Sequence, residues 1–173
     1  MDLRAAIIKE HSKKQAVLIA NYIGNNQDRF DILMHLFLTD EYRVTQRAAY
    51  AISHCTDRHL NLVIPHLPAM VEYLKDKSAH IAVRRNIVRI LSQIDLPEDL
   101  MGTVATLCFD FIIDPKEAVA VKIYSMEVLY NLTLKEPGLK EELVLVIEEN
   151  MAYGSAGIRS RGNKILKRLS KKI

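Results

Sequence analysis

The sequence has no tryptophan, only two cysteines and only six glycines among its 173 residues. Cys55 and Cys108 cannot form the disulfide framework of a small secreted domain, and both have the apolar neighbours typical of reduced, buried cysteine. No apolar run approaches the roughly 20 residues of a membrane-spanning helix. Residues 1–14 contain neither a long apolar segment nor a small-residue cleavage site. These absences predict a cytoplasmic protein.

Sequence patterns typical of catalysis or metal binding are also absent. His54, Cys55 and His59 lie close together, but structural zinc sites usually combine a short spacing such as Cys-x2-Cys with a second, distant pair. Ser53, His54 and Asp57 would diverge on a helix, and no strained turn presents a nucleophile. The scattered glycines form no phosphate-binding motif. We therefore predict no catalytic residue, no metal site and no cofactor.

One nine-residue phrase occurs four times along the chain. It reads VTQRAAYAI from Val44, VRRNIVRIL from Val83, VKIYSMEVL from Val121 and IRSRGNKIL from Ile158, so the starts are 39, 38 and 37 residues apart. Every copy is apolar or small at its first, fifth, eighth and ninth places. At 100° per residue these places share one arc of a helix, so each phrase predicts an amphipathic helix with this stripe buried. A period near 38 residues predicts a stacked repeat protein.

A second series with the same period lies between the phrases. Leu33, Val71, Phe109 and Ile147 are each separated by 38 residues, which predicts a first helix ahead of each phrase helix. Period-two alternation is absent, so no strand is expected. We predict one all-α domain over residues 1–173. It divides into an N-terminal helical pair (1–26) and four two-helix units (27–56, 57–95, 96–135 and 136–173).

Several residues mark the expected helix ends. Ser12 and Gly24 suit the start and end of a helix in the N-terminal pair. Pro65 and Pro68 fall inside the first helix expected over residues 60–75, so a kink or break is expected there. Asp114 is predicted to cap the helix that carries the Val121 phrase.

These features resemble the HEAT repeat family of armadillo-like α-solenoids. The likeness rests on helix pairs of 37 to 39 residues, on proline in a first helix, and on the Val-Arg or Val-Lys opening at Val83-Arg84 and Val121-Lys122, which Ile158-Arg159 approximates. Thr45 departs from the basic residue at that place. The resemblance implies a right-handed superhelix whose second helices line a concave face, and a scaffold function.

The third, seventh and tenth places of each phrase point away from the buried stripe, toward that expected concave face. This arrangement predicts a binding surface of mixed character, with arginine and lysine around an apolar and aromatic patch. An alternative is that Ile123 and Tyr130 simply pack on a neighbouring helix. The candidate binding residues are Tyr50, Arg85, Arg89, Ile123, Glu127, Tyr130, Lys164 and Lys167.

The basic residues are concentrated near the C-terminus. From Ser155 onward the chain has seven basic residues and no acidic one, although the net charge of the whole sequence is only +3. The predicted basic patch consists of Arg159, Arg161, Lys164 and Arg168. It is interpreted either as a solubilising cap or as a contact surface for an acidic partner.

Three functions remain open at this point. A protein or peptide partner fits the mixed surface best. Nucleic-acid binding through Arg84, Arg85, Arg89 and the basic C-terminal helix is the second hypothesis, although Ile123 and Glu127 interrupt a continuous basic track. The third is an enzyme related to the solenoid lyases or DNA glycosylases. The glycosylases use tryptophan in their groove, which this chain lacks, and no residue supports the lyases.

Overall fold

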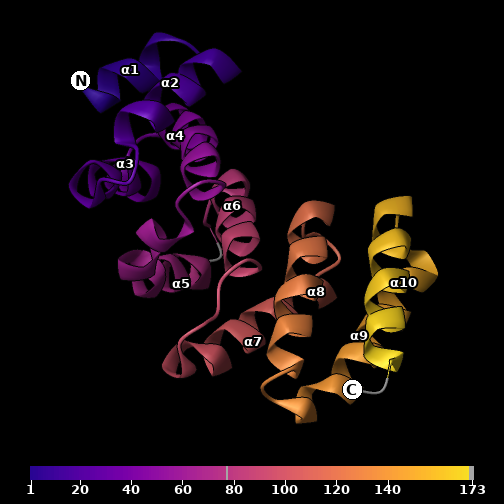
Figure 1. Cartoon of the computed structure of the whole chain (residues 1–173). Helices are drawn as coiled ribbons and strands as arrows, with labels where there is room; N and C mark the ends of the chain where they lie inside the picture. Colours follow the sequence, from indigo (N-terminus) through magenta and orange to yellow (C-terminus); the bar gives the residue numbers. More distant parts are fainter. Residues whose placement is uncertain (77, 172–173) are drawn as a thin grey trace. The chain divides into compact units, whose positions relative to one another are not determined.

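The computed structural model describes residues 1–76 and 78–171. In this described part the chain forms ten α-helices, two short 3-10 helices and no strand, which confirms the all-α prediction. The elements are α1 (Leu3–Lys9), α2 (Lys13–Ile23), α3 (Gln27–Thr39), α4 (Tyr42–Thr56), η1 (Leu60–His66), α5 (Leu67–Lys75), α6 (Ile81–Leu91), α7 (Glu98–Ile113), α8 (Val119–Thr133), η2 (Pro137–Leu139), α9 (Lys140–Tyr153) and α10 (Ala156–Ser170) (Figure 1).

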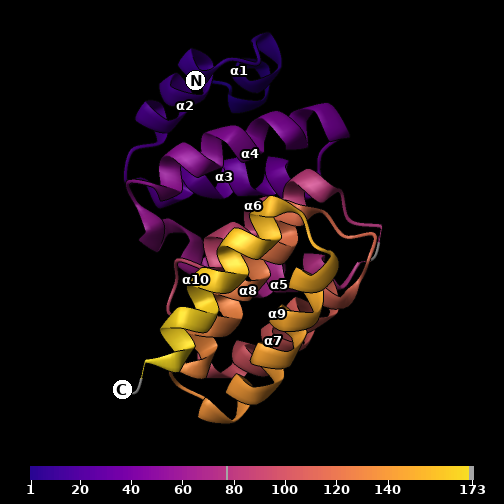
Figure 2. The ribbon, with the colours of Figure 1, turned by 90° about the vertical axis from the view of Figure 1, so that its right-hand side faces the viewer.

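The chain divides into two compact units, Met1–Asn86 and Ile87–Ile173, and the division falls within α6. In the first unit α4 packs against α1, α2 and α3, and η1 packs against α3, α4 and α5. In the second unit α8 packs against α7 and α10, and α9 packs against α7 and α10. Figures 1 and 2 show α10 beside α8, and α9 beside α7. First helices therefore contact first helices and second helices contact second helices, as in a helical repeat protein.

The phrase stripes form the core of each unit. Every stripe position in the first three phrases is buried, and in the last phrase only Leu166 is partly exposed. The first-helix series is buried as well, with exposed fractions of 0% for Leu33, 2% for Val71, 8% for Phe109 and 0% for Ile147. Both series bury their apolar faces because a helix presents every third or fourth residue to the same neighbour. The predicted repeat register is confirmed.

Most of the predicted helix ends are confirmed. The Ser12 hydroxyl accepts a hydrogen bond from the Gln15 backbone N–H and caps α2, which ends at Gly24 with a φ of 53° that suits glycine. The first helix expected over residues 60–75 is broken, because the 3-10 helix η1 contains Pro65 and α5 begins only at Leu67. Proline at position 65 lacks the N–H that a continuous α-helix needs there.

The predicted cap at Asp114 is wrong. This residue follows the end of α7, and its carboxylate accepts a hydrogen bond from the Lys116 backbone N–H inside the turn. The helix that carries the Val121 phrase, α8, begins at Val119 after Ala118, with no side-chain cap. Asp114 forms a local turn because its short side chain reaches the backbone two residues ahead.

Candidate protein-binding surfaces

The side chain at the second place of each phrase binds the connection between the two helices of its repeat. In all four copies this side chain donates a hydrogen bond to a backbone carbonyl oxygen at the turn or at the end of the first helix. The pairs are Thr45 to Asp40 (3.1 Å), Arg84 to Ala79 (3.3 Å), Lys122 to Ile112 (2.8 Å) and Arg159 to Gly154. Carbonyls at helix ends lack an intrahelical donor, so the bonds to Asp40, Ile112 and Gly154 each satisfy one of them, whereas Ala79 lies in the connection between α5 and α6. Thr45 departs from the basic pattern in charge but performs the same role.

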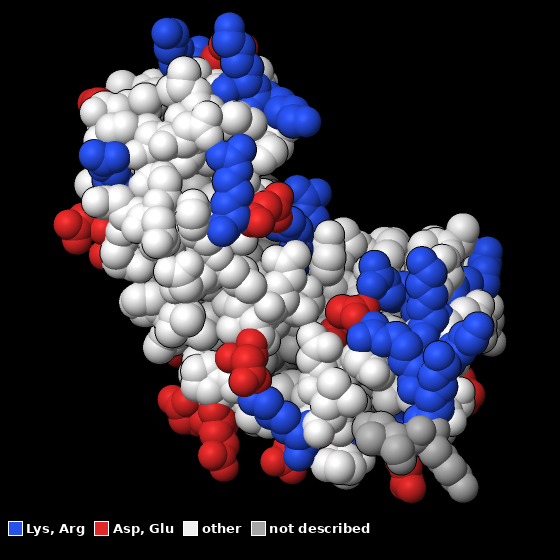
Figure 3. Space-filling view, in the orientation of Figure 1, with Lys and Arg blue, Asp and Glu red and all other residues white. Residues whose placement is uncertain are grey.

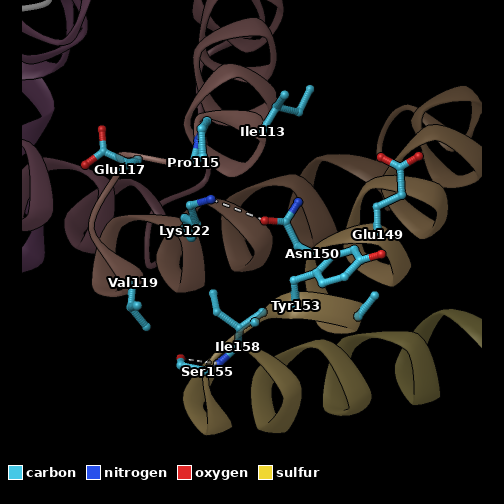
Figure 4. A pocket seen from close by; sticks show the side chains of 12 residues that line it. Ile113, Pro115, Glu117, Val119, Lys122, Glu149, Asn150, Tyr153, Ser155 and Ile158 are labelled. Atoms are coloured by element: carbon cyan, nitrogen blue, oxygen red, sulfur yellow. Dashed lines mark hydrogen bonds between the residues drawn. The ribbon is translucent and has the colours of Figure 1, made fainter.

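Lys122 lies in a pocket of about 680 Å³ beside the repeat turns of the second unit (Figure 4). Its amine also donates to Asn150 Oδ1 at 3.3 Å, which links α8 to α9. Burial lowers the pKa of the Lys122 amine, and the charges of Asp114 and Glu117 oppose that shift. The pocket wall includes Tyr153, which is 97% exposed. Sequence reasoning missed this pocket because the residues that line it are shared between two repeats.

In the first unit the candidate residue Tyr50 belongs to a small ring cluster. Its ring centroid lies 5.1 Å from that of His54 on the same helix and 6.3 Å from that of His11, between α1 and α2. Tyr50 remains partly exposed. The cluster therefore fixes the orientation of an aromatic side chain that still reaches the surface of α4.

The three candidate arginines lie on α6. Arg85 is exposed and Arg89 is partly exposed one turn later, so both lie on one face of the helix. Arg84 points elsewhere, because its guanidinium donates to the Ala79 carbonyl oxygen. Arg85 is therefore the most accessible of the three positive charges.

In the second unit Glu127 and Tyr130 of α8 are joined to α10 by two arginines. Glu127 accepts hydrogen bonds from Arg161 at 2.7 Å and from Arg168. The Arg168 guanidinium also lies over the Tyr130 ring, 3.6 Å from its centroid. Burial alone would raise the pKa of Glu127, but the hydrogen bonds and charges of Arg168 and Arg161 outweigh it and hold that pKa below its usual value. We call Glu127, Tyr130, Arg161 and Arg168 the α8–α10 cluster.

Ile123 also contacts α10. Its Cδ1 atom lies 3.4 Å from the position that a Cβ would occupy at Gly157, near the start of that helix. Ile123 and Tyr130 remain partly exposed. Each of these two candidate anchors therefore packs on the neighbouring helix and also contributes to the surface.

A row of exposed cations lies along α10. Lys164, Lys167 and Arg168 are exposed on α10 within four residues of one another, and the exposed Lys171 directly follows the helix end at Ser170. We call them the α10 basic stripe, and Figure 3 shows Lys and Arg gathered over this helix. The stripe leads to a pocket of about 330 Å³ whose wall includes Tyr130, Thr133, Leu134 and Lys140 beside Arg168 and Lys171.

Over residues 1–76 and 78–171 no group of three His, Cys, Asp or Glu residues could hold a metal ion. Cys55 and Cys108 are buried, and burial raises the pKa of each thiol to about 12, which disfavours the reactive thiolate. In the same part of the chain no helix combines the length and apolarity that a membrane crossing requires.

The pairing of Glu127 with two arginines was not anticipated, although the repeat register contains a signal for it. Glu127 and Lys164 both hold the seventh place of their phrases. Arg161 precedes Lys164 by three residues and Arg168 follows it by four, so both are one turn from the position facing Glu127. A carboxylate at that place can therefore meet both arginines when α8 and α10 lie side by side.

Comparison with known proteins gives one match. A family model described as HEAT repeat domain matches residues 3–169, which is nearly the whole chain. No curated protein and no solved structure matches this chain.

Proposed function

Because the chain belongs to the HEAT repeat domain family, whose members typically bind proteins, we propose that it is a non-catalytic scaffold that binds another protein or a peptide. In each compact unit the proposed binding residues lie on the outward faces of the second helices. They are those predicted from the phrase register: Tyr50 and Arg85 in the first unit, and Arg89, Ile123, Glu127, Tyr130, Lys164 and Lys167 in the second.

The observation that carries this proposal is the α8–α10 cluster. The Arg168 guanidinium lies over the Tyr130 ring, and the same guanidinium forms an ion pair with Glu127. Tyrosine and arginine are the residue types most enriched at the energetic centres of protein interfaces. Their side chains are already ordered by packing between two helices, so binding would require little additional loss of side-chain entropy. The exposed Lys164 and Lys167 provide the charged rim that such a centre usually has.

Nucleic-acid binding through Arg84, Arg85, Arg89 and the basic C-terminal helix is less well supported. Arg84 donates to a turn carbonyl, and Arg161 and Arg168 are paired with Glu127. A phosphate backbone is recognised by cations that are free to replace its counterions. Each internal partner lowers the number of such cations on this surface.

The proposal is tested by purifying the tagged protein from its native organism and identifying by mass spectrometry what is retained in stoichiometric amount. The affinity of the recovered partner is then measured for the wild type and for Tyr130→Ala. A matched control is Tyr22→Ala, because Tyr22 also lies under an arginine, Arg29, at 4.3 Å, but on α2 in the first unit.

We expect Tyr130→Ala to weaken binding of a protein partner by about 1–2 kcal/mol or more, and Tyr22→Ala to have little effect. Removing the charge of Lys164 or Lys167 should act mildly, mainly on the association rate. Recovery of nucleic acid would overturn the proposal if its affinity falls steeply with salt and Tyr130→Ala binds normally. Retention of a protein partner that is insensitive to Tyr130→Ala would exclude the proposed surface.

A further inference from the structure

We propose that the partner presents a short acidic segment to the α10 basic stripe, and that one carboxylate side chain of this segment enters the pocket beside Tyr130. This inference rests on the proposed protein-binding function. It adds the chemistry of the partner and the position of its anchor.

The length of the stripe sets the length of the segment. Lys164 lies on α10, and Lys171, seven residues later, directly follows the end of that helix at Ser170. At 1.5 Å of rise per residue the stripe extends about 10 Å. An extended peptide advances about 3.3 Å per residue, so about three residues span that distance. The stripe therefore matches a run of about three acidic residues.

The pocket at the end of the stripe is suited to an acidic side chain. Within the described part of the chain, the residues that line it include two lysines, Lys140 and Lys171, beside Arg168, which is paired with Glu127, and no carboxylate. Leu134, which is 53% exposed, adds an apolar wall next to the Tyr130 ring. The pocket has a volume of about 330 Å³, which is large enough for one carboxylate side chain and part of an apolar neighbour.

The position of Lys140 argues against a purely solubilising role for these charges. Cations near the end of α10 are favoured by the helix dipole, so the stripe alone would be explained by helix stability. Lys140, however, is the first residue of α9, where the same dipole disfavours a positive charge. The next two residues, Glu141 and Glu142, follow the usual preference for acidic side chains. Helix stability therefore does not account for this cation, which lines the pocket.

A protein segment fits this site better than a nucleic acid. Binding of single-stranded nucleic acid depends on aromatic faces that stack with bases. The Tyr130 ring is covered on one face by Arg168 at 3.6 Å.

The test uses fluorescence anisotropy with the full chain and a fluorescein-labelled peptide of three successive glutamates followed by leucine. The control probes are the same peptide with glutamines in place of glutamates, and a labelled ten-nucleotide oligothymidylate. The protein variants are Lys140→Glu/Lys171→Glu and a matched control, Lys13→Glu/Lys14→Glu, which reverses two exposed lysines on α2. Circular dichroism and thermal melting verify the fold of each variant.

We expect the wild type and the Lys13→Glu/Lys14→Glu control to bind the glutamate peptide equally. Lys140→Glu/Lys171→Glu should bind it at least tenfold more weakly, and the glutamine peptide should bind poorly to all three proteins. The inference is overturned if the wild type does not bind the glutamate peptide, if both double variants bind it equally, or if the oligothymidylate binds more tightly. A native protein partner that depends on Tyr130 but not on Lys140 and Lys171 would overturn this inference and leave the proposed function intact.

Discussion

Replacing one buried leucine by alanine tests the repeat register. Leu91, Leu129 and Leu166 hold the ninth place of successive phrases, and all three lie in the second compact unit. Leu129 is 0% exposed and Leu91 is 1% exposed, whereas Leu166 is partly exposed. Leucine to alanine removes three carbon groups, which at about 0.8 kcal/mol each gives about 2.4 kcal/mol from transfer alone. The cavity left behind raises the expected cost to about 2–5 kcal/mol for Leu91→Ala and Leu129→Ala.

Leu166→Ala should cost roughly half as much, because part of that side chain is already in contact with water. The free energy of unfolding is measured by urea titration followed by circular dichroism, with the slope compared between variants to verify that the same transition is observed. Leu145→Ala on α9 is the control, since Leu145 is 62% exposed in the same unit and should change stability by about 0.5 kcal/mol or less. The reasoning is refuted if Leu166→Ala is the most damaging of the three, or if Leu145→Ala matches Leu129→Ala.

Three further predictions concern charge, backbone and metal. The folded-state pKa of Glu127 lies below its usual value of 4.5. Its contribution to stability is therefore present above about pH 4.5 and is lost as the pH falls through the folded-state pKa. Glu127→Gln should lower the free energy of unfolding at pH 7 and make that free energy depend less on pH in the acid range. A Cβ added at Gly102 in α7 would meet no atom within 4 Å, so Gly102→Ala should stabilise the protein by about 0.5–1 kcal/mol in the same urea titration. A Cβ added at Gly162 would lie 2.4 Å from Met151 Sδ, so Gly162→Ala should destabilise the protein by about 1–3 kcal/mol. Elemental analysis should find no stoichiometric zinc or iron, and a chelator should leave the melting temperature unchanged.

The core could be predicted from the sequence because burial follows helical geometry. Val121 and Leu129 lie eight residues apart, and that spacing places them on one face whatever the neighbouring helix is. A stripe that recurs with one period also determines which helices are equivalent. The all-α fold and the burial of the series from Leu33 to Ile147 are confirmed for this reason.

Helix starts were harder to predict. Ser12 and Asp114 carry the same kind of local signal, an oxygen that can bind a backbone N–H. Ser12 caps α2, but Asp114 binds Lys116 inside a longer turn, and α8 begins several residues later. The two uses of such a side chain depend on the path of the turn, which local sequence does not determine.

The candidate surface could be predicted only in outline. The phrase register places Glu127 and Tyr130 outside the buried stripe, but their contacts with Arg161 and Arg168 depend on how far α10 is shifted along α8. The pocket near Lys140 depends on the same shift and on the path through η2. Such distances between helices are set by packing of both partners, so a single sequence does not specify them.

We expect the hydrogen bonds from the second place of each phrase to make the turns tolerant of changes in length. If the acceptor were a side chain, a suitable residue would be needed at one particular position of the turn. Every residue of a turn has a backbone carbonyl oxygen, so the donor can find an acceptor whatever the sequence of the turn. Thr45 donates to a carbonyl oxygen beside the short connection between α3 and α4, and Lys122 donates to one beside the longer connection between α7 and α8. Insertions or deletions in these connections can thus be accommodated by changing the reach of one side chain. The drift in phrase spacing from 39 to 38 to 37 residues is compatible with this mechanism.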